Sequence, residues 1–241
     1  MLGDIKVFVV ETPAQAAEAS VLLDEVWHAT SMVAPEVIVA ALHSGGYCAI
    51  ARLGATGDGE VVGASFALAT NTGILHSHVT GVAQNRVGIG IGTQLKRHQW
   101  YWAQLNGYHA ISWTFDPLVR RNAWFNLVKL GASVVSYHKD FYGELADAIN
   151  VGEHSDRLLV HWSVPTTGDP QMGTFVTGNI GDVVVPTPDD IETLRRQDRS
   201  AAQHWRSRQR ESFALLAKPG AKIRGLDNDY SYVISIASEK I

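Results

Sequence analysis

The order of hydrophobic and polar positions predicts a chain in which strands and helices follow one another. Runs of β-branched and aromatic residues indicate strands, and apolar residues recurring every three or four positions indicate helices. We expect strands at 5–12, 47–54, 60–70, 73–83, 109–117, 133–143 and 156–164. We expect helices at 12–29, 34–46, 91–107 and 118–132. This mixture predicts an α/β (α+β) protein.

The pattern restarts after a turn-rich stretch, "PTTGDP", at 165–170. Here we expect a strand at 182–188, a helix at 187–220 and a closing strand at 230–238. The chain is therefore predicted to have one domain at 1–165 and a β-α-β extension at 171–241. Arginines and acids alternate along the extension, which predicts a solvated helix face. These arginines are Arg195, Arg196, Arg199, Arg206, Arg208 and Arg210.

The composition narrows the function only slightly. Hydrophobic residues make up 46% and charged residues 18% of the 241 residues, as in ordinary globular proteins. With 20 basic and 24 acidic side chains, the chain lacks the basic footprint of general nucleic-acid binding. The single cysteine, Cys48, offers no intrachain disulfide and no metal cluster, so we expect no metal. Without a visible targeting segment or an apolar stretch near roughly 20 residues, we expect a cytoplasmic protein with no membrane partner.

Gly88, Gly90 and Gly92 alternate where a helix must begin. A P-loop spacing does not fit them. A dinucleotide loop needs G-x-G-x-x-G and a later acidic residue, but Asn106 and Gly107 stand where that residue should fall. A third interpretation is that the segment is similar to the loop of acyl-CoA-dependent N-acyltransferases, a turn whose backbone N–H groups and helix dipole receive the CoA pyrophosphate. The alternative is a glycine-rich turn that binds nothing.

The segment around these glycines, "GVAQNRVGIGIGTQL", resembles the Q/R-x-x-G-x-G/A motif of the GNAT (GCN5-related N-acetyltransferase) superfamily. The motif runs from Val87 to Gly92, and Val87 replaces the usual Gln or Arg. A second segment, "RRNAWFNLVKLGA", resembles the family helix that packs beside the pantetheine arm of CoA. In it, Leu127 stands where many members carry a tyrosine thought to protonate the departing thiolate.

The similarity is closer to one branch of predicted GNAT proteins. These carry LHSH, WTFDPL, RNA-x-FN, KLGA, YG and SDR in this order, and all six segments are present between Leu75 and Arg157. The resemblance covers most of residues 1–163. It implies the GNAT fold, a mixed central β-sheet flanked by helices. It also implies an acyl-CoA cofactor, with acetyl-CoA as the default and a longer donor such as succinyl-CoA left open.

The resemblance also implies which residues contact CoA. The backbone of Val82 matches the position that bonds the pantetheine, and the glycine loop matches the pyrophosphate site. Asn122 and Asn126 lie four apart on one helix face, where amides suit the peptide-like groups of pantetheine. Phe125 would pack along the same arm, with burial in the core as the alternative. The full set is Val82, Val87, Gly88, Ile89, Gly90, Ile91, Gly92, Thr93, Asn122, Phe125 and Asn126.

Two histidines upstream of the glycine loop are the candidate catalytic residues. Strand alternation places His76, His78 and Thr80 on one face. Imidazole titrates at about pH 6.5, which suits a general base that takes a proton from an ammonium. By resemblance, His76 falls six residues before Val82, where some relatives carry a glutamate base. The alternative is that both histidines bond the backbone or each other as polar core groups.

Asp116 and Arg157 are weaker candidates for substrate binding. Asp116 could bind the substrate ammonium or orient a histidine, but a turn or N-cap role for the following helix is favoured. Arg157 is a candidate for binding an anionic acceptor, and a structural salt bridge is its alternative.

These observations predict an N-acyltransferase that moves an acyl group from acyl-CoA to the amine of a small molecule, such as an amino acid. Transfer would be direct, in a ternary complex. One alternative is a non-catalytic acyl-CoA-binding or regulatory protein, which Leu127 favours and the paired histidines oppose. Another is a protein acetyltransferase, which no acidic run supports. Two roles stay open for the extension: formation of a homodimer and covering of the acceptor site.

Overall fold

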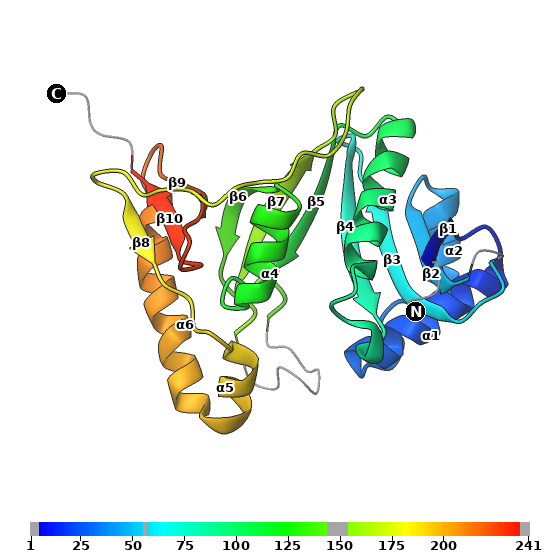
Figure 1. Cartoon of the computed structure of the whole chain (residues 1–241), viewed down its shortest axis with the longest axis horizontal. Helices are drawn as coiled ribbons and strands as arrows, with labels where there is room; N and C mark the ends of the chain where they lie inside the picture. The colour runs from blue at the N-terminus through cyan, green and yellow to red at the C-terminus, as the bar shows by residue number, and fades with distance from the viewer. Residues whose placement is uncertain (1–4, 55–56, 144–153, 237–241) are drawn as a thin grey trace. The chain divides into compact units, whose positions relative to one another are not determined.

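The computed structural model describes residues 5–54, 57–143 and 154–236 (Figure 1). The chain divides into two compact units, and the division falls inside strand β5 (Ala110–Phe115). The first unit holds the described residues up to 113 together with 163–170. The second holds the described residues between 114 and 162 and those from 171 onward. The domain boundary expected between 165 and 171 stays a prediction.

The first unit is built on a mixed sheet. β1 pairs antiparallel with β2, β2 with β3, and β3 with β4, whereas β5 runs parallel to β4. A parallel pair needs a crossover connection, and helix α3 (Ile91–Leu105) supplies it. The bounds are β1 (Ile5–Val9), β2 (Tyr47–Leu53), β3 (Val61–Ala69) and β4 (Ile74–Val82). This arrangement confirms the predicted mixed sheet.

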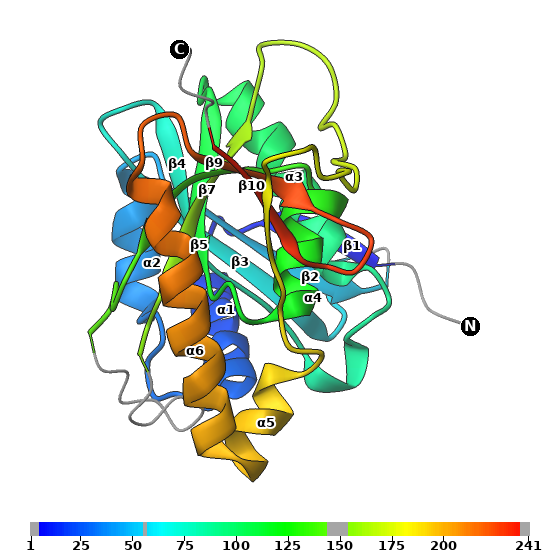
Figure 2. The ribbon, with the colours of Figure 1, turned by 90° about the vertical axis from the view of Figure 1, so that its left-hand side faces the viewer.

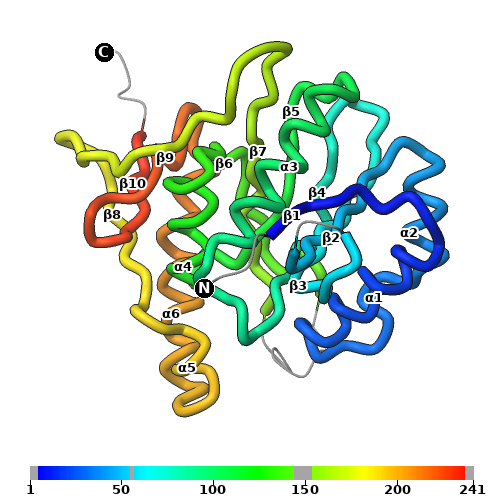
Figure 3. Tube along the Cα trace, turned by 45° about the vertical axis from the view of Figure 1, so that its right-hand side comes forward, coloured from blue at the N-terminus to red at the C-terminus, as the bar shows by residue number. Residues whose placement is uncertain are grey.

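Helices cover both faces of this sheet. Figure 3 labels these helices and the strands of the sheet along the chain trace. On one face, Leu23 of α1 (Pro13–Trp27) and Ile38 of α2 (Pro35–His43) pack in one apolar cluster with Phe66 of β3. On the other face, Ile91 and Leu95 of α3 pack with residues of β2 and β3. A short 3-10 turn, η1 (Gln84–Arg86), joins β4 to the glycine loop.

A segment from much later in the chain completes the packing of α3. The indole Nε1 of Trp100 donates a hydrogen bond to the backbone carbonyl of Ser163 at 2.8 Å. The side-chain amide of Gln104 donates to the carbonyl of Pro165, also at 2.8 Å. Residues 163–170 therefore belong to the first unit although most of their sequence neighbours lie in the second.

Among the residues that the structure describes, the second unit contains two sets of paired strands and four helical segments. β6 pairs antiparallel with β7, and a three-stranded sheet has the order β8-β10-β9. The strands are β6 (Ser133–His138), β7 (Arg157–Ser163), β8 (Val183–Val185), β9 (Lys222–Leu226) and β10 (Tyr232–Ser235). The helices are α4 (Arg120–Trp124), which continues as the π-helical turn η2 (Phe125–Lys129), then α5 (Ile191–Gln197), α6 (Arg199–Phe213) and the 3-10 turn η3 (Ala214–Ala217).

The extension differs from its prediction in two ways. The single helix expected at 187–220 is broken at Asp198, and Figure 2 shows α5 and α6 meeting at an angle. The break arises because the carboxylate of Asp198 accepts the backbone N–H of Ala201 and so caps a new helix. Strand β9 was not expected, and residues 237–238 of the predicted last strand lie outside the described residues. None of the helices in the described ranges has the length and apolar character to cross a membrane.

Candidate functional site

The glycine loop leaves the first turn of α3 open. Gly88 and Gly90 have φ angles of +88° and +95°, a left-handed backbone that favours glycine. Gly90 is the N-cap of α3, and its turn receives no side-chain cap from the described residues. Gly92 is less constrained, since a Cβ there would stand 3.8 Å from a methyl of Val82. The exposed loop thus offers backbone N–H groups at the positive end of a 15-residue helix.

A β-bulge in β4 changes which side chains share a face. Phe66 of β3 pairs with Val79, but the next residue pairs with Ser77, so His78 is an extra residue without a partner in the ladder. The ring of His78 lies edge-on to Phe66, on the face covered by α1 and α2. The Thr80 hydroxyl instead bonds Ser65 at 2.8 Å, on the α3 face. The prediction that Thr80 joins the two histidines is therefore wrong.

His76 and His78 do lie on the same face of β4. The Nδ1 atom of His76 is 3.2 Å from the hydroxyl of Ser112 on β5, and the ring is half-buried. Partial burial lowers the pKa of His76 below its usual value, and the neighbouring His78 and Lys96 lower it further. Partial desolvation lowers the pKa of the more exposed His78 as well. Both rings are therefore held mainly neutral at pH 7, the state in which imidazole accepts a proton.

The pairing of β4 with β5 is short and leaves a fork. The registered pairs run from Ile74↔Ala110 to His76↔Ser112, while β4 itself continues to Val82. We call the point just beyond the last pair the fork apex; its first residues are Ser77 on β4 and Trp113 on β5. A strand that leaves its partner in this way exposes backbone groups that a ligand can bond.

A buried lysine that the sequence analysis did not single out stands at the fork apex. Lys96 of α3 is 4% exposed, and its ammonium donates to the Ser77 hydroxyl at 3.0 Å and to Gln99 Oε1 at 2.8 Å. The same nitrogen lies 4.0 Å from the centre of the Trp113 ring. Gln99 in turn donates to Ser65 at 3.3 Å, which makes a continuous polar network inside the α3 face. Burial lowers the pKa of Lys96 to about 7.

Asp116 is buried in the second unit, and both of its oxygens are bonded. One accepts from Arg195 at 2.6 Å and from Arg206 at 2.7 Å, and the other accepts the backbone N–H of Leu118 at 2.9 Å. Burial alone would raise the pKa of Asp116, but the charges and hydrogen bonds of the two arginines outweigh it and lower the pKa. These bonds favour the turn role over binding of a substrate ammonium.

The extension's arginines do not form a uniformly solvated face, contrary to the sequence prediction. Arg206 is 4% exposed, and the side chain of Arg195 is also buried. Arg210 donates to the fully buried carboxylate of Asp156 at 2.6 Å. The reason is long-range charge pairing. Asp116 and Asp156 bond guanidinium groups that the local charge pattern predicts to be exposed to solvent.

Arg157, at the start of β7, has a different environment. Its guanidinium donates to the backbone carbonyl of Asp156 at 3.0 Å and lies 5.4 Å from the centre of the Tyr142 ring. The Tyr142 hydroxyl is 3.2 Å from that of Thr114 on β5. Within the described ranges, no carboxylate forms an ion pair with Arg157, although the residue is half-buried. The structural salt bridge considered for Arg157 is therefore not found there.

The three pantetheine candidates lie on one helical segment of the second unit. Asn126 is buried in the π-helical turn, and its backbone carbonyl accepts the N–H of Ala132 at 3.0 Å. Asn122 and Phe125 are half-buried. Leu127 is buried at the position where the family tyrosine would stand, so this position carries no hydroxyl.

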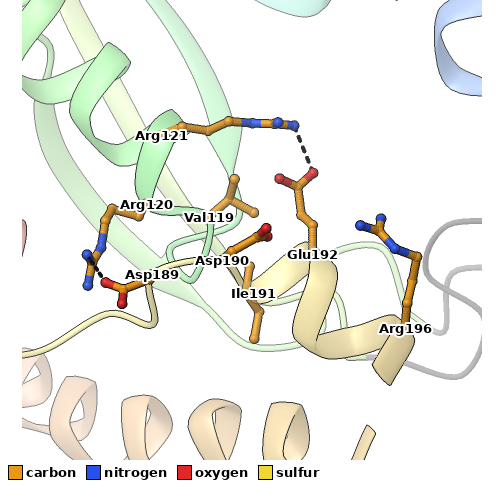
Figure 4. A pocket seen from close by; sticks show the side chains of 8 residues that line it. All are labelled: Val119, Arg120, Arg121, Asp189, Asp190, Ile191, Glu192 and Arg196. Carbon is orange, nitrogen blue, oxygen red and sulfur yellow. Dashed lines mark hydrogen bonds and ion pairs between the residues drawn. The ribbon is translucent and has the colours of Figure 1, made fainter. Parts of the chain in front are cut away.

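The second unit also holds a polar pocket of about 330 Å³ that contains none of the predicted site residues. Figure 4 shows its charged groups largely facing one another: Arg121 bonds Glu192 at 2.8 Å, and Arg120 bonds Asp189. This internal pairing leaves little charge for a ligand. The lining residues are Val119, Arg120, Arg121, Asp189, Asp190, Ile191, Glu192 and Arg196.

Comparison with known proteins identifies the fold. No protein-family model and no curated protein sequence matches the chain. Among solved structures, a GNAT-family acetyltransferase from Desulfovibrio desulfuricans is similar over 67% of this chain and 100% of its own, with TM-score 0.53 and 17% identity. The ribosomal-protein-S18-alanine N-acetyltransferase from Escherichia coli matches 68% of this chain and 97% of its own, with TM-score 0.53 and 11% identity.

A third structure, a GNAT acetyltransferase from Elizabethkingia anophelis with acetyl-CoA bound, matches 66% of this chain and 97% of its own. Its TM-score is 0.50 and its identity 18%. At such identities the likeness concerns the fold, and it confirms the GNAT fold that the sequence predicts.

Proposed function

We infer that the chain is an acyl-CoA-dependent N-acyltransferase that acts on the amine of a small molecule. The observation that carries this inference is the exposed start of α3, which receives no side-chain cap from the described residues. In a GNAT fold, it follows β4 after one 3-10 turn and the glycine loop. Free backbone N–H groups at the end of a long helix complement a pyrophosphate. Acyl-CoA supplies the acyl group as a thioester, with acetyl as the default.

Donor binding divides among three groups of residues. The backbone N–H groups of the glycine loop and of the first turn of α3, from Val87 to Thr93, would hold the pyrophosphate. The main chain of Val82, at the end of β4 beyond its registered pairs with β5, would bond the pantetheine amides. Asn122, Phe125 and Asn126 are proposed for the pantetheine arm, since side-chain amides match its peptide-like groups.

The two histidines of β4 are proposed as the bases. Since burial keeps His76 neutral at pH 7, its free nitrogen lone pair can accept a proton from an incoming ammonium. The hydrogen bond to Ser112 fixes the orientation of the ring. His78 is exposed on the same face, where it can pass protons to solvent.

Arg157 supports an acceptor that carries an anionic group, such as an amino acid. A half-buried guanidinium that forms no ion pair with a carboxylate in the described ranges has a charge to offer a ligand. The contact with the Tyr142 ring, at 5.4 Å from its centre, uses none of the guanidinium N–H donors. Those not bonded to the Asp156 carbonyl can therefore bond a carboxylate.

A non-catalytic acyl-CoA-binding protein remains the second candidate. The observation that favours it is the buried Leu127, which leaves the usual acid position without a proton to give. Such a protein would bind acyl-CoA and release no thiol.

The test combines calorimetry with thiol release. The protein is titrated with acetyl-CoA and with succinyl-CoA, and thiol release is then followed against paired acceptors, each amino acid beside its amide. We expect micromolar-range binding and faster release with the free acid. Binding without release from any acceptor would support the regulatory protein, and absence of binding would refute both candidates.

A further inference from the structure

The fork apex contains a cation that the proposed function does not yet use. Lys96 bridges the two strands just where they separate, since its nitrogen contacts Ser77 on β4 and Trp113 on β5. In the part of the chain that the structure describes, no carboxylate forms an ion pair with it. Burying an ammonium among neutral acceptors is costly. A hydrophobic residue would fill this position between α3 and the sheet without that cost, which points to a role for the amine.

Ser77 connects Lys96 to the open side of the fork. Its hydroxyl accepts the Lys96 bond, and this uses the oxygen while leaving the hydroxyl proton available. Ser77 follows His76, the last residue of β4 in a registered pair with β5. Ser77 is 5% exposed and Lys96 is 4% exposed, so a group that bonds the Ser77 hydroxyl must enter the fork apex itself.

The two faces of β4 carry opposite chemistry. His76 and His78, which accept protons, point to the face covered by α1 and α2. Ser77 and Lys96, which donate protons, point to the face covered by α3. Amide formation from a thioester needs a base for the incoming nitrogen and an acid for the departing sulfur, and the two faces of β4 supply one of each.

We propose that Ser77 and Lys96 form the proton-donating pair that serves the departing thiolate of CoA. As the carbon–nitrogen bond forms and the carbon–sulfur bond breaks, the Ser77 hydroxyl gives its proton to sulfur and Lys96 replaces that proton. The acceptor nitrogen loses two protons through the histidines; one proton returns the neutral Lys96 to its charged form and the other goes to solvent. Ser77 is the contacting group, and Lys96 acts through it. This inference rests on the proposed function.

The surroundings of Lys96 determine its titration. From β4, His76 is the titratable group that interacts with it, across the strand. On α3 itself, Gln99 is neutral and His98 bonds the Tyr47 hydroxyl of β2 at 2.9 Å. From β5, the facing group is the Trp113 ring. With burial as the main influence, a pKa of about 7 lets Lys96 hold and release a proton near neutral pH.

The first experiment needs no activity. Lysine Cε signals of the unliganded protein, labelled with ¹³C, are followed by NMR from pH 5 to 11. We expect one lysine to titrate near pH 7 and its signal to vanish in Lys96→Met. Arg97→Met, an exposed neighbour on the same helix, is the matched control and should leave that signal in place. A Lys96 signal that titrates above pH 10 would overturn the proposal.

The second experiment compares acetyl-CoA with its selenoester analogue, whose selenolate leaves without protonation because a selenol is a stronger acid than a thiol. We expect Ser77→Ala and Lys96→Met to lower kcat by about 100-fold with the thioester and by much less with the selenoester. In the unchanged protein, kcat should fall above pH 7 because Lys96 loses its proton. Lys96→Met should remove that fall. Ser77→Ala is a small change, so it tests the proposal even where Lys96→Met fails to fold.

The outcomes separate the two proposals. Equal losses with both donors, or unchanged rates in both variants, would refute the proton-donating pair while leaving the N-acyltransferase function intact. If the unchanged protein binds no acyl-CoA or releases no thiol or selenol, the proposed function fails and this inference fails with it.

Discussion

Asp116 should hold the extension to the rest of the second unit, and its replacement by asparagine measures that contribution. Asp116→Asn keeps the size of the side chain but removes the charge that pairs with Arg195 and Arg206. Because both guanidinium groups are buried, the variant leaves two charges without compensation, and breaking a buried pair costs about 3–5 kcal/mol. That is a large share of the roughly 5–15 kcal/mol by which a native protein is stable.

Urea unfolding followed by circular dichroism tests this magnitude. The control is Asp189→Asn, because Asp189 also pairs with an arginine, Arg120, but has a side chain that is 92% exposed. An exposed pair contributes at most about 1 kcal/mol, so the control should lose little. Equal losses in the two variants would refute the assignment of Asp116 as a buried charge centre.

The difference in free energy of unfolding between the wild-type protein and Asp116→Asn should depend on pH. The arginines lower the pKa of Asp116 in the folded state, whereas the unfolded chain has a pKa of about 3.9. Its charged contribution is therefore complete above about pH 5 and is lost as the pH falls through and below that unfolded value. The free energies of unfolding of the wild-type protein and Asp116→Asn should converge toward pH 2. A gap that stays constant down to pH 3 would contradict the charge explanation.

Four further results are expected. Gly90→Ala strains a φ of +95° and should lower stability by about 1 kcal/mol and weaken acetyl-CoA binding, as measured by calorimetry. His76→Ala should reduce kcat at least tenfold with unchanged acetyl-CoA affinity. The wild-type rate should rise with pH through a pKa below about 6.5. Full activity in the variant would refute the assignment of His76 as the base. Arg157→Met should raise KM for acid acceptors but not for their amides. Cys48, whose pKa burial raises to about 12, should react with thiol reagents only after unfolding.

Local signals in the sequence predicted well the elements that depend on neighbours along the chain. Thr12 caps α1 together with Gln15, and Pro13 is the first helical residue, so the helix expected from 12 begins within one residue of that position. The glycine loop likewise stands directly before α3. Such features need only a few adjacent residues, so their chemistry is visible in the sequence.

The bulge in β4 was hidden for a physical reason. Buried residues alternate without a break from Leu75 to Gly81, so the pattern resembles a regular strand. The extra residue appears only in the register with β3, where His78 is skipped. The alternation therefore predicted correctly that His76 and His78 share a face and incorrectly that Thr80 joins them.

Long-range charge pairing was equally invisible. Arg206 bonds Asp116, which lies 90 positions earlier in the sequence. No local pattern distinguishes Arg206 from an arginine exposed to solvent. Lys96 was missed because a single lysine within a helix is usually a surface residue. Only the packing of α3 on β4 shows that its amine is buried at the fork apex.

The return of residues 163–170 to the first unit has a consequence for how the protein is made. During synthesis, α3 leaves the ribosome well before the segment whose carbonyl groups receive the bonds of Trp100 and Gln104. The helix that begins at the glycine loop therefore cannot complete its contacts until Pro165 has been added and the intervening chain has been spanned. The order of translation thus delays the completed packing of α3 until about two thirds of the chain exists.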